Sequence, residues 1–149
     1  MELWIGGDRM KFFIKLNVVS ALFGFVIFAG IELMLNVYKI SRWTGLEVGT
    51  VSNLETIFIL VMVISSALLF PRLIRYWLMR RKASYFTVLL WIPYFVLFVY
   101  LFRITFPMTN PGDDPNPATG LVMIAALFLY PFFLLLVNLL AAFEINKGA

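Results

Sequence analysis

The sequence predicts an all-α integral membrane protein, a four-helix bundle that crosses the bilayer up, down, up and down. Of its 149 residues, 62% are hydrophobic and only 13% are charged, whereas soluble domains are roughly 45–50% apolar and about 25% charged. The apolar residues gather in long stretches that polar connections separate. A soluble domain of this size leaves much of its surface in water, so lipid is the solvent that this composition fits.

The first predicted helix covers residues 16–38, beginning after Lys11 and Lys15. About 20 residues cross the hydrocarbon core at 1.5 Å per residue, so this stretch is long enough. A cleavable signal peptide also places basic residues before an apolar run. The run here is long for such a signal and no Ala-x-Ala site follows it, so an uncleaved helix is favoured.

The second predicted helix covers residues 54–78 and follows a polar connection over residues 39–53. The third covers residues 85–106, after a short basic run. Each is nearly continuous in apolar residues and reaches the length that a bilayer requires.

The fourth predicted helix covers residues 121–143 and follows a loop over residues 107–119. That loop contains four prolines, a glycine and several Asn and Asp residues, which favour turns. No connection is long enough for a soluble domain. Residues 1–149 therefore form a single transmembrane domain.

The lysines and arginines predict the orientation, because cytoplasmic flanks of membrane helices are rich in them. If the connection after the second helix is cytoplasmic, both termini are cytoplasmic too. That side then carries nine of the 12 cations, and the outer side carries Lys39, Arg42 and Arg103. We therefore expect a multi-pass protein of the cell membrane with both ends in the cytoplasm.

Histidine and cysteine are both absent from the chain. Disulfides, thiolate or imidazole metal sites and His-dependent nucleophiles are therefore impossible. No cofactor, metal site or catalytic set is predicted. The net charge is +4, but the cations flank apolar spans, so the expected partner is the bilayer rather than nucleic acid.

Three polar residues near the outer ends of the helices form a candidate intramembrane site: Glu32, Asn36 and Arg103. Glu32 lies about 9 Å below the end of its helix, where ionisable residues are rare and face a cavity or a partner. Asn36 is four residues later, on the same helical face. One interpretation is a proton or cation site that is reached from outside, and the other is an ion pair with Arg103.

A cytoplasmic basic patch is the second candidate site, comprising Arg72, Arg75, Arg80, Arg81 and Lys82. It fits attraction to anionic lipid headgroups, at about 1 kcal/mol per cation, and it also fits docking of an acidic protein or a phosphate group. Ser20 and Gly24 form a small-xxx-small spacing, which allows close helix packing within the chain or in a homo-oligomer.

These features predict a protein that acts by interaction, as an accessory subunit, regulator or immunity-type factor of a membrane component. The alternative is a small transporter or channel that uses Glu32, which requires a water-accessible cavity around that residue. A lipid-acting enzyme is a third hypothesis, for which the chain offers no plausible acid/base pair.

Overall fold

The computed structural model describes residues 2–78 and 82–143 of the chain. Within these ranges the secondary structure is helical and no strand occurs, so the predicted all-α class is confirmed. Arg80 and Arg81 of the basic patch lie outside the described residues. The elements in chain order are α1 (Glu2–Leu35), α2 (Val37–Thr44), α3 (Val48–Trp77), the 3-10 helix η1 (Lys82–Phe86), α4 (Thr87–Thr105), the 3-10 helix η2 (Pro111–Asp113) and α5 (Pro117–Phe143).

Four segments are long and apolar enough to cross a membrane, and they identify a multi-pass membrane protein. They are Gly7–Leu35, Val48–Trp77, Lys82–Thr105 and Pro117–Phe143. Large apolar side chains also point outward from the bundle: Leu60, Ile64 and Leu68 of α3 are each more than half exposed. Hydrocarbon solvates such a surface, whereas monomeric soluble proteins rarely expose apolar patches of this extent.

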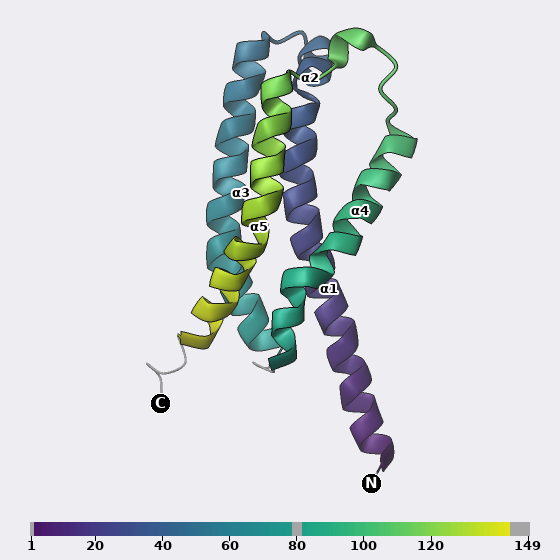
Figure 1. Ribbon diagram of the computed structural model, residues 1–149, viewed down its shortest axis with the longest axis vertical. Coiled ribbons are helices and arrows are strands. Elements are labelled where there is room, and N and C mark those ends of the chain that lie inside the picture. Colours follow the sequence, from purple (N-terminus) through teal and green to yellow (C-terminus); the bar gives the residue numbers. More distant parts are fainter. Residues whose placement is uncertain (1, 79–81, 144–149) are drawn as a thin grey trace.

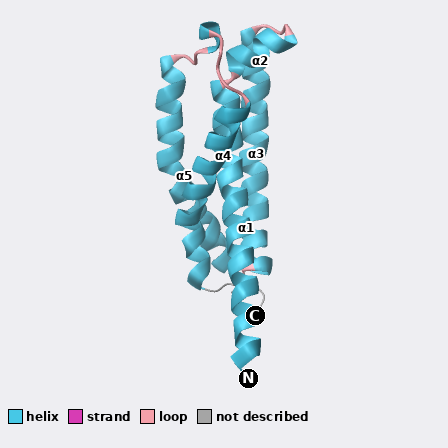
Figure 2. Cartoon of the chain, turned by 90° about the vertical axis from the view of Figure 1, so that its right-hand side faces the viewer, coloured by secondary structure: helices cyan, strands magenta, loops and turns pink. Residues whose placement is uncertain are grey.

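Consecutive long helices run in opposite directions in Figure 1. One end of the bundle carries α2 and η2, and the other carries η1 together with the first residues of α1 and the last residues of α5. The N-terminal part of α1 extends beyond the other helices in both views (Figure 1, Figure 2). This arrangement divides the molecule into an η1 half and an α2 half, which differ in their interiors.

The helices are longer than the predicted ranges, because those ranges follow the apolar runs. Helix α1 begins at Glu2 instead of residue 16, since polar residues extend a helix as readily as apolar ones. Helix α5 begins at Pro117 instead of residue 121. The Asn116 side chain accepts a hydrogen bond from the Ala118 amide at 3.0 Å, and proline is well suited to a first helical position.

The segment predicted as a polar connection, residues 39–53, is largely helical as well. Helix α2 occupies its first part, and it ends where Gly45 adopts a left-handed conformation with φ of 71°. Glycine is favoured there because it has no Cβ to clash. The connection between α2 and α3 is thereby reduced to residues 45–47.

The core of the protein lies in the η1 half and takes side chains from all four long helices. Phe23 packs on Phe70 with ring centroids 4.3 Å apart, and Trp91 meets the edge of Tyr130 at 4.9 Å. The Tyr130 hydroxyl donates a hydrogen bond of 2.6 Å to the main-chain oxygen of Phe23. Leu134 completes this apolar interior with no exposed surface.

Helices α1 and α4 make their closest approach at Gly24. A Cβ atom built on Gly24 would lie 2.8 Å from the Trp91 main-chain oxygen and 3.0 Å from the Phe95 nitrogen. Ser20, one turn earlier, is fully buried and bonds its own helix at the Leu16 oxygen. The small-xxx-small pair therefore serves packing within the chain. Beyond Gly24, α4 leans away from α1 toward the α2 end (Figure 1).

Candidate functional site

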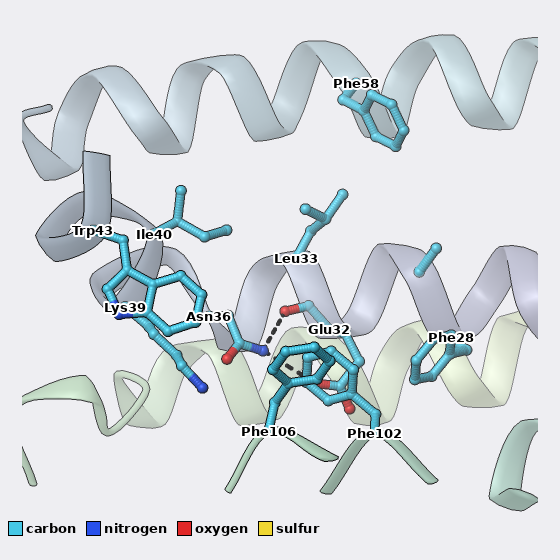
Figure 3. Close-up of a pocket in the computed structure, with 11 residues that line it drawn as sticks. Phe28, Glu32, Leu33, Asn36, Lys39, Ile40, Trp43, Phe58, Phe102 and Phe106 are labelled. Atoms are coloured by element: carbon cyan, nitrogen blue, oxygen red, sulfur yellow. Dashed lines mark hydrogen bonds between the residues drawn. The ribbon is translucent and has the colours of Figure 1, made fainter. Parts of the chain in front are cut away.

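A cavity of about 430 Å³ lies in the α2 half, where α1 and α4 diverge. Figure 3 shows its lining, with α1 and α2 along one side and α4 and α3 supplying aromatic rings. The cavity is open on one side, where Phe58 of α3 is 55% exposed. Its lining residues are Phe28, Ala29, Glu32, Leu33, Asn36, Lys39, Ile40, Trp43, Phe58, Phe102 and Phe106.

The polar residues of the cavity share one face of a continuous helical stretch. Glu32, Asn36, Lys39 and Trp43 are spaced four, three and four residues apart, which is the spacing of neighbours on a helix surface. Asn36 separates α1 from α2, yet the hydrogen bonding continues across it. Its amide donates to Glu32 O at 3.1 Å, and its own oxygen accepts from the Ile40 amide at 2.8 Å.

Glu32 is buried at 7% exposure and only half of its carboxylate is satisfied. The Asn36 side-chain amide donates to Glu32 Oε2 at 3.1 Å and to the Glu32 main-chain oxygen at 2.8 Å (Figure 3). The second carboxylate oxygen, Oε1, is buried and has no hydrogen-bond partner among the described residues. Buried polar atoms are nearly always paired, so this oxygen is a vacant acceptor in a residue of the cavity wall.

Lys39 is the second charged group of the cavity and is also 7% exposed. Its ammonium lies 5.0 Å from the centroid of the Trp43 ring and 6.0 Å from that of Phe106. Cation–π attraction at this range stabilises a cation that has left water. Lys39 forms no ion pair with any described residue, so the cavity holds one carboxylate and one ammonium that are not joined.

The opposite wall of the cavity is aromatic. Phe102 lies 5.8 Å from Phe28 and 5.2 Å from Phe106 between ring centroids. Phe98 and Phe102 are four residues apart on α4 and share a face, and Phe106 follows directly after the helix ends at Thr105. The result is an apolar chamber with a single polar strip, a lining typical of sites that bind small molecules or apolar segments.

Arg103, the third residue of the predicted polar site, is exposed and does not line the cavity. It forms no ion pair with Glu32, and the ion pair within the described ranges joins Arg42 and Asp113. The proposed Glu32–Arg103 pair is therefore not formed. Glu32 and Asn36 are brought together as their spacing indicates, and Arg103 is left outside.

The Arg42–Asp113 pair ties α2 to η2. Arg42 Nε donates to Asp113 Oδ1 at 3.0 Å, and Nη2 donates to Oδ2. Asp113 is almost fully buried, whereas the Arg42 side chain is about half exposed. The hydrogen bond from Arg42 lowers the pKa of Asp113 below its ordinary value of 3.8, because it stabilises the ionised carboxylate.

Acid is expected to release this pair. The lowered pKa means that the pair stabilises the fold above pH 3.8, and that this contribution is lost as the pH falls through the folded-state pKa. Asp113→Asn should therefore lower the melting temperature in detergent at neutral pH and have a smaller effect at about pH 2, where the unfolded chain already holds the proton. Asp114→Asn, at an exposed neighbour, is the control. An equal effect of Asp113→Asn at both pH values would contradict the assignment.

The described members of the basic patch lie at the opposite end of the bundle from the cavity. Arg72 and Arg75 occupy the last turns of α3, and Lys82 begins η1. Arg75 also stacks on Tyr76, with its guanidinium carbon 5.7 Å from the ring centroid. In the described part of the chain, the polar strip of the cavity in the α2 half is thus separate from the basic side chains on the surface of the η1 half.

No metal centre is formed by the described part of the chain, since no group of three acidic side chains gathers there. Comparison of the chain with protein families, with curated proteins and with solved structures finds no match. Any assignment of function therefore depends on the geometry of the site.

Sequence reasoning missed Lys39 and the aromatic wall as parts of this site. The three-residue step from Asn36 to Lys39 could have placed Lys39 on the Glu32 face. That face continues only because residues 37–44 are helical, whereas the sequence predicts a connection there.

Proposed function

We propose that this multi-pass membrane protein acts by binding another membrane component, as an accessory subunit or regulator, and that the cavity around Glu32 receives that component. The observation that carries the proposal is the vacant Glu32 Oε1 acceptor in a chamber open on one side. An inserted group that donates a hydrogen bond to this oxygen would gain the pairing that the free protein lacks.

The energetics of Glu32 favour a functional role over a structural one. A buried acceptor left without a partner costs about 1–3 kcal/mol. Glu32 therefore does not stabilise the free protein through this oxygen. Residues that reduce stability while lining a cavity are characteristic of binding sites, where function and stability conflict.

Binding is favoured over conduction by the interior of the η1 half. Below the cavity, the bundle is filled by the apolar core, in which Phe23 and Leu134 have no exposed surface. Among the described residues, the polar side chains within that core are hydroxyl and amide groups that donate to their own or neighbouring helices, and Asn138 Oδ1 is the one buried acceptor there without a partner. A small transporter that uses Glu32 remains the second candidate, since it too requires an unpaired carboxylate in a cavity.

We propose further that the protein resides in the cell membrane with the η1 end in the cytoplasm. Nine of the 12 cations belong to that side in this orientation, in agreement with the positive-inside rule. The cavity would then lie in the outer half of the bilayer, and a partner would reach it from the lipid or from the outer face.

The test is site-specific crosslinking in the native membrane, with a photoreactive phenylalanine analogue in place of Phe106 at the cavity. We expect one stoichiometric adduct, which Glu32→Leu abolishes. Glu55→Leu, which removes a carboxylate of α3 outside the cavity, should leave the adduct intact. The same analogue at Phe128, an exposed residue of α5, should not form it.

Glu32→Leu is also expected to change the free energy of unfolding of the purified protein by no more than about 1 kcal/mol, because it removes an unpaired acceptor and one hydrogen bond together. Asn36 keeps its 2.8 Å bond to the main-chain oxygen of residue 32 and loses only the acceptor of its other N–H group. An adduct that persists in Glu32→Leu would disprove the binding role of Glu32. Loss of cation flux in liposomes with Glu32→Gln, together with no adduct, would favour the transporter instead.

A further inference from the structure

A surface groove of about 530 Å³ runs between α1 and α3 in the η1 half, separate from the Glu32 cavity. Leu22 and Val26 of α1 form one side, and α3 forms the other from Met62 to Trp77. Most of the lining is aliphatic or aromatic. Leu69 is 57% exposed and Tyr76 is 71% exposed. The groove is therefore on the outer surface of the bundle, where a membrane helix contacts lipid.

The length of the groove matches one leaflet of a bilayer. Met62 lies at the middle of the Val48–Trp77 span, and ten residues separate it from Arg72, or about 15 Å along the helix. The hydrocarbon core of a bilayer is about 30 Å thick, so one leaflet contributes about half of that. The groove therefore extends from the midplane to headgroup level on the η1 side.

The chemistry of the groove changes at its headgroup end. Arg72 lines it there, beside Tyr76 and Trp77, two residue types that favour the membrane interface. Among the described residues, no hydrogen bond or ion pair engages the Arg72 guanidinium. The fork of donors on an arginine fits a phosphate group, while the aliphatic part of the groove fits an acyl chain.

We propose that this groove is a binding site for an anionic phospholipid of the leaflet on the η1 side, with its phosphate on Arg72 and one acyl chain along α3 toward Met62. A zwitterionic lipid would place the positively charged ammonium group of its headgroup near Arg72, and the repulsion between the two cations would weaken its binding. A free phosphate compound would leave the apolar groove unfilled. The proposal is independent of the Glu32 cavity, which lies in the opposite half.

The test is native mass spectrometry of the purified full chain in a nonionic detergent. Phosphatidylglycerol and phosphatidylcholine with identical acyl chains are titrated in parallel, with glycerol phosphate as the chain-free competitor. We expect phosphatidylglycerol to bind about fivefold more tightly than phosphatidylcholine, the effect of about one favourable charge contact. Arg72→Gln should weaken its binding by about fivefold, and Lys82→Gln, which removes a charge outside the groove, should weaken it less.

A second pair of variants tests the acyl-chain site. Leu69→Trp fills the groove and should reduce phosphatidylglycerol binding, whereas Leu68→Trp, at an exposed neighbour that does not line it, should not. Equal binding of the two lipids, equal loss with Arg72→Gln and Lys82→Gln, or full competition by glycerol phosphate would each overturn the proposal. If Leu69→Trp lowers the melting temperature without lipid, the Arg72 and Lys82 comparison decides alone.

Discussion

We expect Gly24→Leu to separate α1 from α4 and to prevent the bundle from folding, because there is no room for a side chain at this residue. The first side-chain atom would lie 2.8 Å from the Trp91 oxygen and 3.0 Å from the Phe95 nitrogen. Both are backbone atoms, so relief requires a shift of the whole of α4. Overpacking by single methylenes costs about 1–3 kcal/mol, and a leucine against a fixed backbone should exceed the upper end of that range.

The loss is measured as the melting temperature in detergent, followed by circular dichroism. Gly7→Leu is the matched control, because Gly7 lies on the same helix and has nothing within 4 Å of its Cβ position. Gly30→Ala should have an intermediate effect, because the Met62 methyl group that it meets at 3.2 Å can move. Similar melting of the Gly24 and Gly7 variants would contradict a fixed α1–α4 contact.

Phe23→Ala is expected to have the next largest effect, because it empties the centre of the core. The Phe23 side chain is fully buried and lies against Phe70 at 4.3 Å between centroids. Phe→Ala substitutions in cores cost about 3–5 kcal/mol. Lipid tails are as apolar as a protein core, so the loss here comes from packing, and we expect about 3 kcal/mol, the lower end of that range.

Phe13→Ala provides the comparison, because Phe13 lies on the same helix with 62% of its side chain exposed. It should change the free energy of unfolding by less than about 0.5 kcal/mol. The Tyr130 bond to the Phe23 main-chain oxygen survives in both variants, so the difference reports the side chain alone. Unfolding in mild denaturant within mixed micelles measures both values, and equal losses would mean that Phe23 is not the centre of the core.

The membrane spans were predictable from the sequence because hydrocarbon imposes a length and a composition on any helix that crosses it. The ends of the helices were not predictable in this way, because a helix can continue into polar residues beyond the end of its apolar run. Lys11 and Lys15 are inside α1, where their stems can lie along lipid while their ammonium groups reach water. Local signals existed at α5, where Asn116 and Pro117 form a recognisable helix start.

The site was predictable only where it is local in sequence. The four-residue step from Glu32 to Asn36 places both on one face, and they do bond. The Arg42–Asp113 pair joins residues 71 positions apart, and only the folded connection brings the proline-rich loop to α2. The phenylalanines of α4 gave no signal either, because aromatic residues occur throughout the chain.

The overhang of α1 has a mechanical consequence. A helix of 34 residues is about 51 Å long, and the hydrocarbon layer takes up about 30 Å of it. Its first turns therefore reach beyond the hydrocarbon and join, without a break in the helix, the segment that packs on α4 at Gly24. A molecule that bound these turns in the aqueous layer would thus be connected to the Glu32 face through one continuous helix, with no flexible linker between them.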